Sequence, residues 1–152
     1  MANTYSQIYI HVVFAVKGRQ NLISKNWKDE LYKYITGIVT NEGQKLIAVN
    51  GMPDHIHILI GLKPNKALSD LVRDIKANSS RFINEKKWIN GKFEWQNGFG
   101  AFSYSHSQLT NVINYIQNQE EHHKKKTFKE EYVDFLKAFD VDFKNEFIFE
   151  EV

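Results

Sequence analysis

The segment from Asn50 to Ile60 constrains the fold of this chain more than any other part of the sequence. The turn signal Gly51-Met52-Pro53-Asp54 runs directly into the alternating sequence His55-Ile56-His57-Ile58-Leu59-Ile60. Side chains two residues apart on a strand share a face, so His55 and His57 project together while the isoleucines project to the opposite side. The pattern predicts a β-strand with one packed face and a second face that carries two imidazoles.

The histidine pair has two interpretations that its spacing alone does not separate. Two imidazoles one pleat apart can converge on a divalent metal ion, or they can be half-buried groups that hydrogen-bond to neighbouring backbone. The 152-residue chain has no cysteine, so any metal must sit on histidine, carboxylate or amide ligands. The lack of cysteine also suits a reducing cytoplasm, which is where we expect the protein.

Hydrophobic periodicity predicts the order of the other elements. Strands are predicted over Tyr5–Val16, Leu46–Asn50 and about Gly100–Tyr104, and helices over Trp27–Asn41 and from Leu68 to Ile83. The resulting order strand, helix, strand, strand, helix, strand indicates an α+β fold of ferredoxin-like or RRM-like type. In this fold a four-stranded antiparallel sheet carries two helices on one face.

One domain over residues 1–152 suits this length, with a core over about 5–138 and a tail, 139–152, whose conformation the sequence does not predict. No stretch is long enough to span a membrane. His11 interrupts the apolar alternation of the first strand, and we interpret it as a paired polar group or cross-strand neighbour. The net charge of +2 permits a nucleic-acid partner without arguing for one.

A further helix follows the fourth strand and would dock on the open face of the sheet. Ser105 and Gln108 have capping-box spacing, and an apolar stripe follows: Leu109, Val112, Ile113 and Ile116. At 100° per residue, Tyr115, Gln119 and His122 lie together beside that stripe. Spacing alone leaves open whether Tyr115 belongs to a site or is a surface residue of an amphipathic helix.

Basic side chains occur on the polar side of the second long helix and just before a last helix, predicted from Thr127 to Ala138. They are Arg73, Lys76, Arg81, Lys124, Lys125 and Lys126. Such charges can simply be solvated, or they can contact a phosphate backbone. We take them as candidate DNA-binding residues.

A metal at the histidine pair would make tyrosine the natural partner for phosphate chemistry. Mg²⁺ or Mn²⁺ can polarise a phosphate oxygen, and a phenolate that attacks phosphorus forms a phosphotyrosine. This intermediate conserves the energy of the broken phosphodiester for later rejoining, whereas simple hydrolysis needs no tyrosine.

These motifs together resemble one family. His55-Ile56-His57 is similar to the histidine-hydrophobic-histidine signature of the HUH endonucleases, and Tyr115-Ile116-Gln117-Asn118-Gln119 resembles the nucleophile helix of their single-tyrosine transposases. The flanking segments Met52–His57 and Trp95–Phe99 are also similar to those enzymes and to the REP-associated tyrosine transposases. The resemblance extends from the first strand to about Ala138, with each motif on the element predicted for it.

The resemblance implies a transposase that nicks and rejoins single-stranded DNA beside a hairpin at the end of a mobile element. Tyr115 would become linked to the 5′ phosphate and free a 3′ hydroxyl, while His55, His57 and Gln119 hold the divalent metal. It also implies a homodimer, in which the tyrosine helix of one subunit can lie against the histidine pair of the other. The exposed edges of so small a sheet favour such pairing.

Two other classes of protein remain as alternatives. A non-catalytic, single-strand-binding module of RRM-like fold is the main one, because Gly98–Tyr104 partly echoes the aromatic strand motif of those domains, although it follows the second helix here. A metal-dependent hydrolase is the other, but neither His11-Val12-Val13 nor His106-Ser107-Gln108 supplies the second motif of the two-histidine phosphoesterases. A covalent protein–DNA adduct distinguishes the transposase from both.

Overall fold

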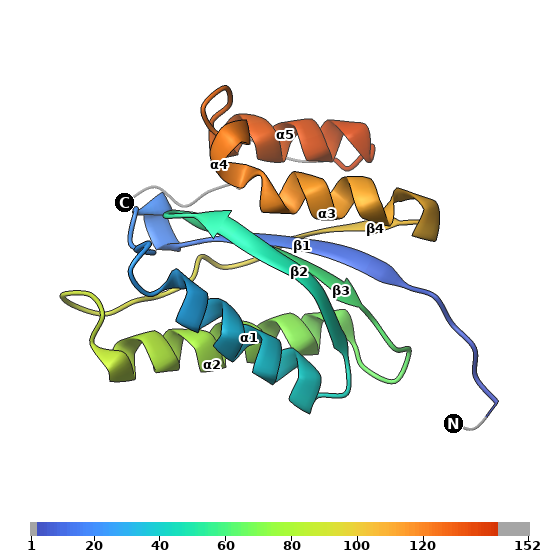
Figure 1. Ribbon diagram of the computed structural model, residues 1–152, viewed down its shortest axis with the longest axis horizontal. Coiled ribbons are helices and arrows are strands. Elements are labelled where there is room, and N and C mark those ends of the chain that lie inside the picture. Colours follow the sequence, from blue (N-terminus) through green and yellow to red (C-terminus); the bar gives the residue numbers. More distant parts are fainter. Residues whose placement is uncertain (1–2, 143–152) are drawn as a thin grey trace.

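The computed structural model describes residues 3–142 and arranges them in three layers (Figure 1). The middle layer is a four-stranded antiparallel sheet of order β2-β3-β1-β4, made of β1 (Tyr9–Ala15), β2 (Lys45–Met52), β3 (His55–Gly61) and β4 (Gly100–Tyr104). Helices α1 (Lys28–Asn41) and α2 (Leu68–Lys86) cover one face. On the other face lie α3 (Leu109–Gln117), α4 (Gln119–His122) and α5 (Phe128–Ala138). The predicted fold class is therefore confirmed.

The main core lies between the sheet and the first two helices. Its side chains come from alternate positions of the central strands and from the inner faces of the helices: Val12, Phe14, Ile56, Ile58, Ile60, Leu31, Ile35, Leu71 and Ile75. Burying one such side chain stabilises the fold by about 1.5–3 kcal/mol. Because every second residue of β3 enters this core, the residues between them must face α3 to α5.

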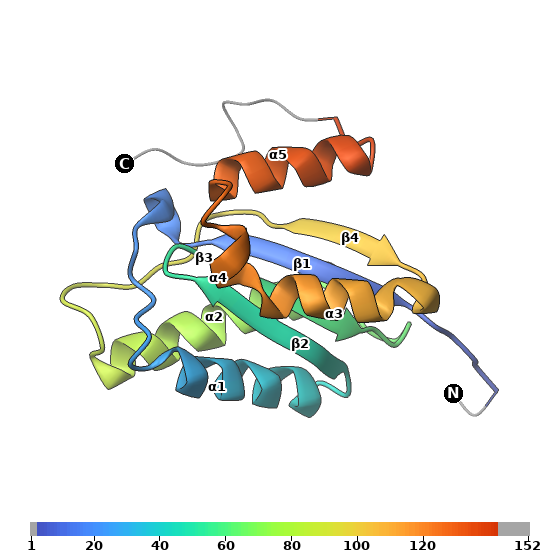
Figure 2. The same ribbon diagram turned by 45° about the horizontal axis from the view of Figure 1, so that its top comes forward.

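The second face of the sheet is covered by two smaller apolar clusters. Helix α3 packs through Val112 and Ile116 on Ala48 of β2 and Leu59 of β3. Helix α5 covers the β1 and β4 side through another group: Phe128 and Leu136, with Val13, Ala15 and Phe102 beneath them. Figure 2 shows the two helices side by side over these opposite halves of the sheet. The two clusters hold α3 and α5 on either side of the histidines.

Several predicted boundaries shift. Strand β1 begins at Tyr9 instead of Tyr5, while β2 extends through Gly51 and Met52, which the sequence pattern assigns to the turn. Pairing continues to the register Met52↔His55, so only Pro53 and Asp54 are left to turn the chain. Short 3₁₀ turns occur at Lys17–Arg19 and His106–Gln108, and the second contains the predicted capping box.

The continuous helix expected through Tyr115, Gln119 and His122 is wrong. Helix α3 ends at Gln117, Asn118 leaves helical geometry with φ −99° and ψ 28°, and α4 begins at Gln119. The predicted last helix is confirmed as α5, with Thr127 as its N-cap. Of the tail predicted over 139–152, residues 143–152 lie outside the described part of the chain. Within residues 3–142, no helix has the length and apolar character needed to cross a bilayer.

A substitution at Gly51 tests how closely β2 approaches β3. A Cβ at this position would lie 2.2 Å from the main-chain oxygen of His55, so Gly51→Ala must push the two strands apart. We expect it to lower the free energy of unfolding by roughly 2 kcal/mol or more in urea titrations. Gly37→Ala is the matched control, because a Cβ there meets nothing within 4 Å; it should stabilise helix α1 by about 0.5–1 kcal/mol. Equal stability of the two variants would contradict this account.

Candidate active site

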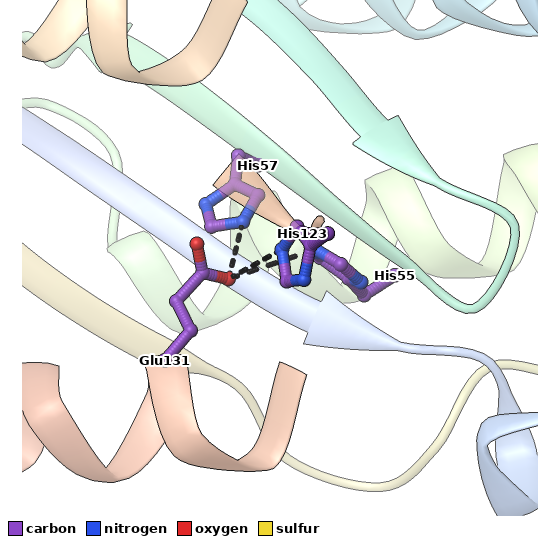
Figure 3. Close-up of side chains that lie close together, drawn as sticks. All are labelled: His55, His57, His123 and Glu131. Carbon is purple, nitrogen blue, oxygen red and sulfur yellow. Dashed lines mark hydrogen bonds and ion pairs between the residues drawn. The ribbon is translucent and has the colours of Figure 1, made fainter. Parts of the chain in front are cut away.

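The predicted histidine pair lies at the centre of a buried polar cluster (Figure 3). His55 and His57 project from β3, His123 follows α4, and Glu131 projects from α5 toward them. One ligand atom from each of these four residues lies within 4.8 Å of all the others. Imidazole nitrogens and a carboxylate oxygen are suitable ligands for a divalent cation, so this donor set fits one.

The carboxyl group of Glu131 joins the members of the cluster. Its Oε1 lies 3.1 Å from Nε2 of His57, 3.3 Å from Nε2 of His123 and 3.6 Å from Nε2 of His55. Only 2% of Glu131 is exposed. Burial, reinforced by repulsion from Asp54 and Asp134, raises the pKa of this carboxyl group to about 8. Burial thus favours the protonated form of Glu131 in the metal-free cluster.

The cluster contains the predicted ligand Gln119 and two further donors, Glu131 and His123. The side-chain oxygen of Gln119 lies 3.2 Å from Nε2 of His55 and 3.0 Å from Nε2 of His123. Sequence reasoning assigned no role to His123 and missed Glu131. The available signal was an acidic residue on the apolar face of α5, three residues after Phe128 and four before Phe135.

Both strand histidines have a partner on the side away from the cluster. Nδ1 of His55 lies 2.7 Å from a carboxylate oxygen of Asp54, and Nδ1 of His57 lies 2.8 Å from Nε2 of His11. Both rings consequently turn Nε2 toward Glu131. Burial, and then the neighbouring imidazoles, lower the pKa of His57 well below its usual range. Neutral imidazole keeps the lone pair that a metal ion needs.

Tyr115 meets the cluster from α3. Its hydroxyl group donates a hydrogen bond to the Glu131 carboxyl group and lies 3.1 Å from Nε2 of His122. The tyrosine ring stands edge-on to the His57 ring, with centroids 5.9 Å apart. Within this single chain the structure thus brings Tyr115, Gln119 and both strand histidines together.

Asn50 fixes the position of Tyr115 relative to the histidine strand. It pairs directly with His57 in the β2–β3 register. Its side-chain amide donates to the main-chain oxygens of Ile116 and Gln117, at 3.0 and 3.1 Å. These bonds satisfy carbonyl groups that the end of a helix leaves free, and they account for the break at Asn118.

The six predicted DNA-binding residues form two separate groups. Arg73, Lys76 and Arg81 line one cavity of about 970 Å³ between α2 and the segment 92–99. Arg73 also pairs with aspartates of its own helix, and the Lys76 ammonium group donates to the main-chain oxygens of Gln96 and Gly98. The second group, Lys124, Lys125 and Lys126, lies in the exposed turn before α5, across the sheet from the first.

A four-stranded sheet that presents a histidine pair to a helix-borne tyrosine is the arrangement expected of a single-tyrosine transposase. Residues 4–119 match the family described as Transposase IS200 like. The chain belongs to this family, which confirms the resemblance inferred from its motifs. It is therefore a transposase-family protein, of a class that cleaves DNA and transfers strands.

Individual relatives agree with this assignment. The ISDra2 transposase TnpA of Deinococcus radiodurans is 27% identical over 120 residues, which cover 74% of this chain and 84% of the relative. A crystal structure assigned as a transposase of Deinococcus radiodurans R1 has a TM-score of 0.62 and 25% identity, covering 77% of this chain and 94% of that one. A REP-associated tyrosine transposase bound to a REP hairpin also has a TM-score of 0.62, over 99% and 91% of the two chains. Its 14% identity shows a shared fold only.

The raised pKa of Glu131 has a consequence for stability. The native chain keeps the Glu131 proton at pH values at which the unfolded chain has lost it. The contribution of Glu131 to the free energy of unfolding therefore falls as the pH rises toward about 8. Glu131→Gln removes this titration. Relative to wild type, its free energy of unfolding should increase between about pH 6.5 and 8, by at most about 1.4 kcal/mol per pH unit. At lower pH His57 and His123, whose pKa values burial lowers, add a pH dependence of their own.

Urea titrations in excess chelator would measure the difference at several pH values. The exposed neighbour substitution Glu130→Gln is the matched control. A constant difference between Glu131→Gln and wild type across the window would show that Glu131 is already ionised in the native chain.

Proposed function

We propose that this transposase cleaves and rejoins single-stranded DNA through a covalent bond between Tyr115 and a 5′ phosphate. A divalent ion, Mg²⁺ or Mn²⁺, would be held by His55, His57 and Gln119, with His123 and Glu131 as further donors. The main support is the position of the Tyr115 hydroxyl group, which shares the Glu131 carboxyl group with His57. A non-catalytic, RRM-like binding module has no need of this shared contact.

In the proposed cleavage, the Tyr115 oxygen attacks phosphorus and forms a new P–O bond. The bond between phosphorus and the 3′ oxygen breaks, the phenol proton is released, and the departing 3′ oxygen takes up a proton to become a hydroxyl group. Rejoining reverses these steps with an incoming 3′ hydroxyl. A bound divalent ion supplies Lewis acidity at the phosphate.

The chain's own residues orient the reacting groups. Glu131 holds the Tyr115 proton at a defined oxygen, and Asn50 holds the end of α3. Both strand histidines are fully buried in the chain without DNA. The same burial means that Glu131 must move aside before a DNA phosphate can reach the histidines.

Loss of the nucleophile is the most direct test. Tyr115→Phe should leave folding and DNA binding nearly unchanged but abolish cleavage and the covalent adduct, because only the attacking oxygen is removed. Wild type in excess chelator should also fail to cleave. Denaturing gels of labelled single-stranded DNA ends would show both effects, with Tyr34→Phe, on the opposite side of the sheet, as the control. An adduct that persists in Tyr115→Phe would refute the assignment.

The proposed partner is single-stranded DNA with hairpin ends. A transposase of the same fold that was solved with a REP hairpin supports this choice, as does the cluster of basic side chains around the α2 cavity. The group at Lys124 to Lys126 lies closer to Tyr115, since Lys126 and Tyr115 line a common cavity of about 310 Å³. We assign the α2 group to the hairpin and the second group to the strand that is cut.

Salt dependence tests the α2 group. Arg73→Ala should weaken binding to all hairpin sequences similarly and reduce the slope of log affinity against log salt by about one unit, because one phosphate contact is lost. Fluorescence anisotropy at several salt concentrations would measure this. Lys33→Ala is the control, because this exposed lysine lies on α1 outside the cavity. An unchanged slope in Arg73→Ala would remove Arg73 from the interface.

The proposal extends to a cytoplasmic homodimer. Strands β2 and β4 are the edges of the sheet, and such edges can pair with a second copy. The contacts of Tyr115 support a site complete within one chain, and exchange of α3 between two chains would rebuild the same contacts across the dimer.

Mixing two inactive variants distinguishes these arrangements. Suppose that each site takes its histidines from one chain and its tyrosine from the other. A mixture of the His57→Ala and Tyr115→Phe variants should then restore cleavage, since one site of each mixed dimer would be intact. Co-purification with two tags would verify that mixed dimers form. Mixed dimers without activity would show that each tyrosine serves its own chain's histidines.

A further inference from the structure

His11 is a buried histidine that the proposed reaction does not use. It lies on β1, fully buried, and stacks on His57 with ring centroids 5.0 Å apart. Its Nε2 lies 2.8 Å from Nδ1 of His57. Its other nitrogen, Nδ1, is buried and has no hydrogen-bond partner among residues 3–142. A residue that only filled space here would be apolar, so the imidazole calls for another explanation.

The contact between the two rings requires a definite placement of protons. Two neutral imidazoles form one hydrogen bond only if one nitrogen carries a proton and the other offers a lone pair. His57 directs Nε2 toward the cluster, where Glu131 lies 3.1 Å away. A nitrogen that binds a metal uses its lone pair, so His57 must then carry its proton on Nδ1. His11 must in turn accept that proton at Nε2 and carry its own on Nδ1.

The neighbouring histidine shows the same arrangement with a carboxylate. His55 also directs Nε2 to the cluster, and its Nδ1 lies 2.7 Å from Asp54. A carboxylate can only accept, which fixes the proton of His55 on Nδ1. Outer partners of this kind set the tautomer and the ring orientation of metal ligands. His11 occupies for His57 the place that Asp54 occupies for His55.

We propose that His11 is a positioning residue of the metal site, accepting the Nδ1 proton of His57 and thereby holding the Nε2 lone pair of His57 toward the cluster. The inference rests on the proposed metal site at His57. In the metal-free chain, His57 can instead donate from Nε2 to Glu131 and accept from His11 at Nδ1. Metal binding would then change the tautomer of both rings, although only His57 touches the ion.

Titration calorimetry with Mn²⁺ alone, on the full chain without DNA, tests this role. His11→Phe keeps an aromatic ring but offers no acceptor, and it should weaken Mn²⁺ binding about 10–100-fold while the chain stays folded by circular dichroism. His11→Gln restores a side-chain acceptor and should recover most of the affinity. Wild-type affinity in a folded His11→Phe variant would overturn the inference.

A wild-type chain that binds no Mn²⁺ would instead refute the proposed metal site, and the role of His11 would fall with it. Nitrogen NMR of histidine-labelled wild type with Zn²⁺, which is diamagnetic, gives a second readout that needs no variant. His11 and His57 should both carry their protons on Nδ1 in the Zn²⁺ form. A proton on Nε2 of His11 in that form would overturn the inference even if His11→Phe failed to fold.

Discussion

The burial of two histidines on a central strand is the constraint on which the rest of the structure depends. Polar groups removed from water need partners, and each ring nitrogen of His55 and His57 has one. The partners come from four other places in the chain: β1, the β2–β3 turn, the segment around α4, and α5. Satisfying the pair thus ties α4 and α5 to the sheet through Gln119 and Glu131.

Local sequence pattern predicted the order of the elements and the face of β3 that carries the histidines. Alternation along β3 separated the core isoleucines from the histidines, and helical spacing put Tyr115 beside Gln119. It could not predict features created by residues distant in the chain. The break at Asn118 depends on Asn50, which is 66 residues away from Ile116, and Glu131 enters the site only because α5 folds back over β1. His11 lies on a predicted strand, but nothing in the sequence indicates that His57 is its partner.

The site draws on residues within and after the part of the chain that matches the transposase family. His55, His57, Tyr115 and Gln119 lie within residues 4–119, the part that matches the transposase family. His123 and Glu131 lie after it. The four residues that the sequence motifs indicated therefore lie in the matched part of the chain, and the two further donors come from the segment that follows it.

The bonds from Asn50 to α3 make the length of the last turn of that helix matter in addition to its side chains. They engage main-chain oxygens, so most side chains there can be replaced without losing them. A residue inserted between Tyr115 and Gln117 would leave the Asn50 hydrogen bonds in place. It would turn the tyrosine by about 100° around the helix axis, away from the histidines. Insertions ahead of Leu109 would leave Tyr115 in place. Among descendants of this sequence, insertions and deletions should thus accumulate before α3 and be absent from its last turn.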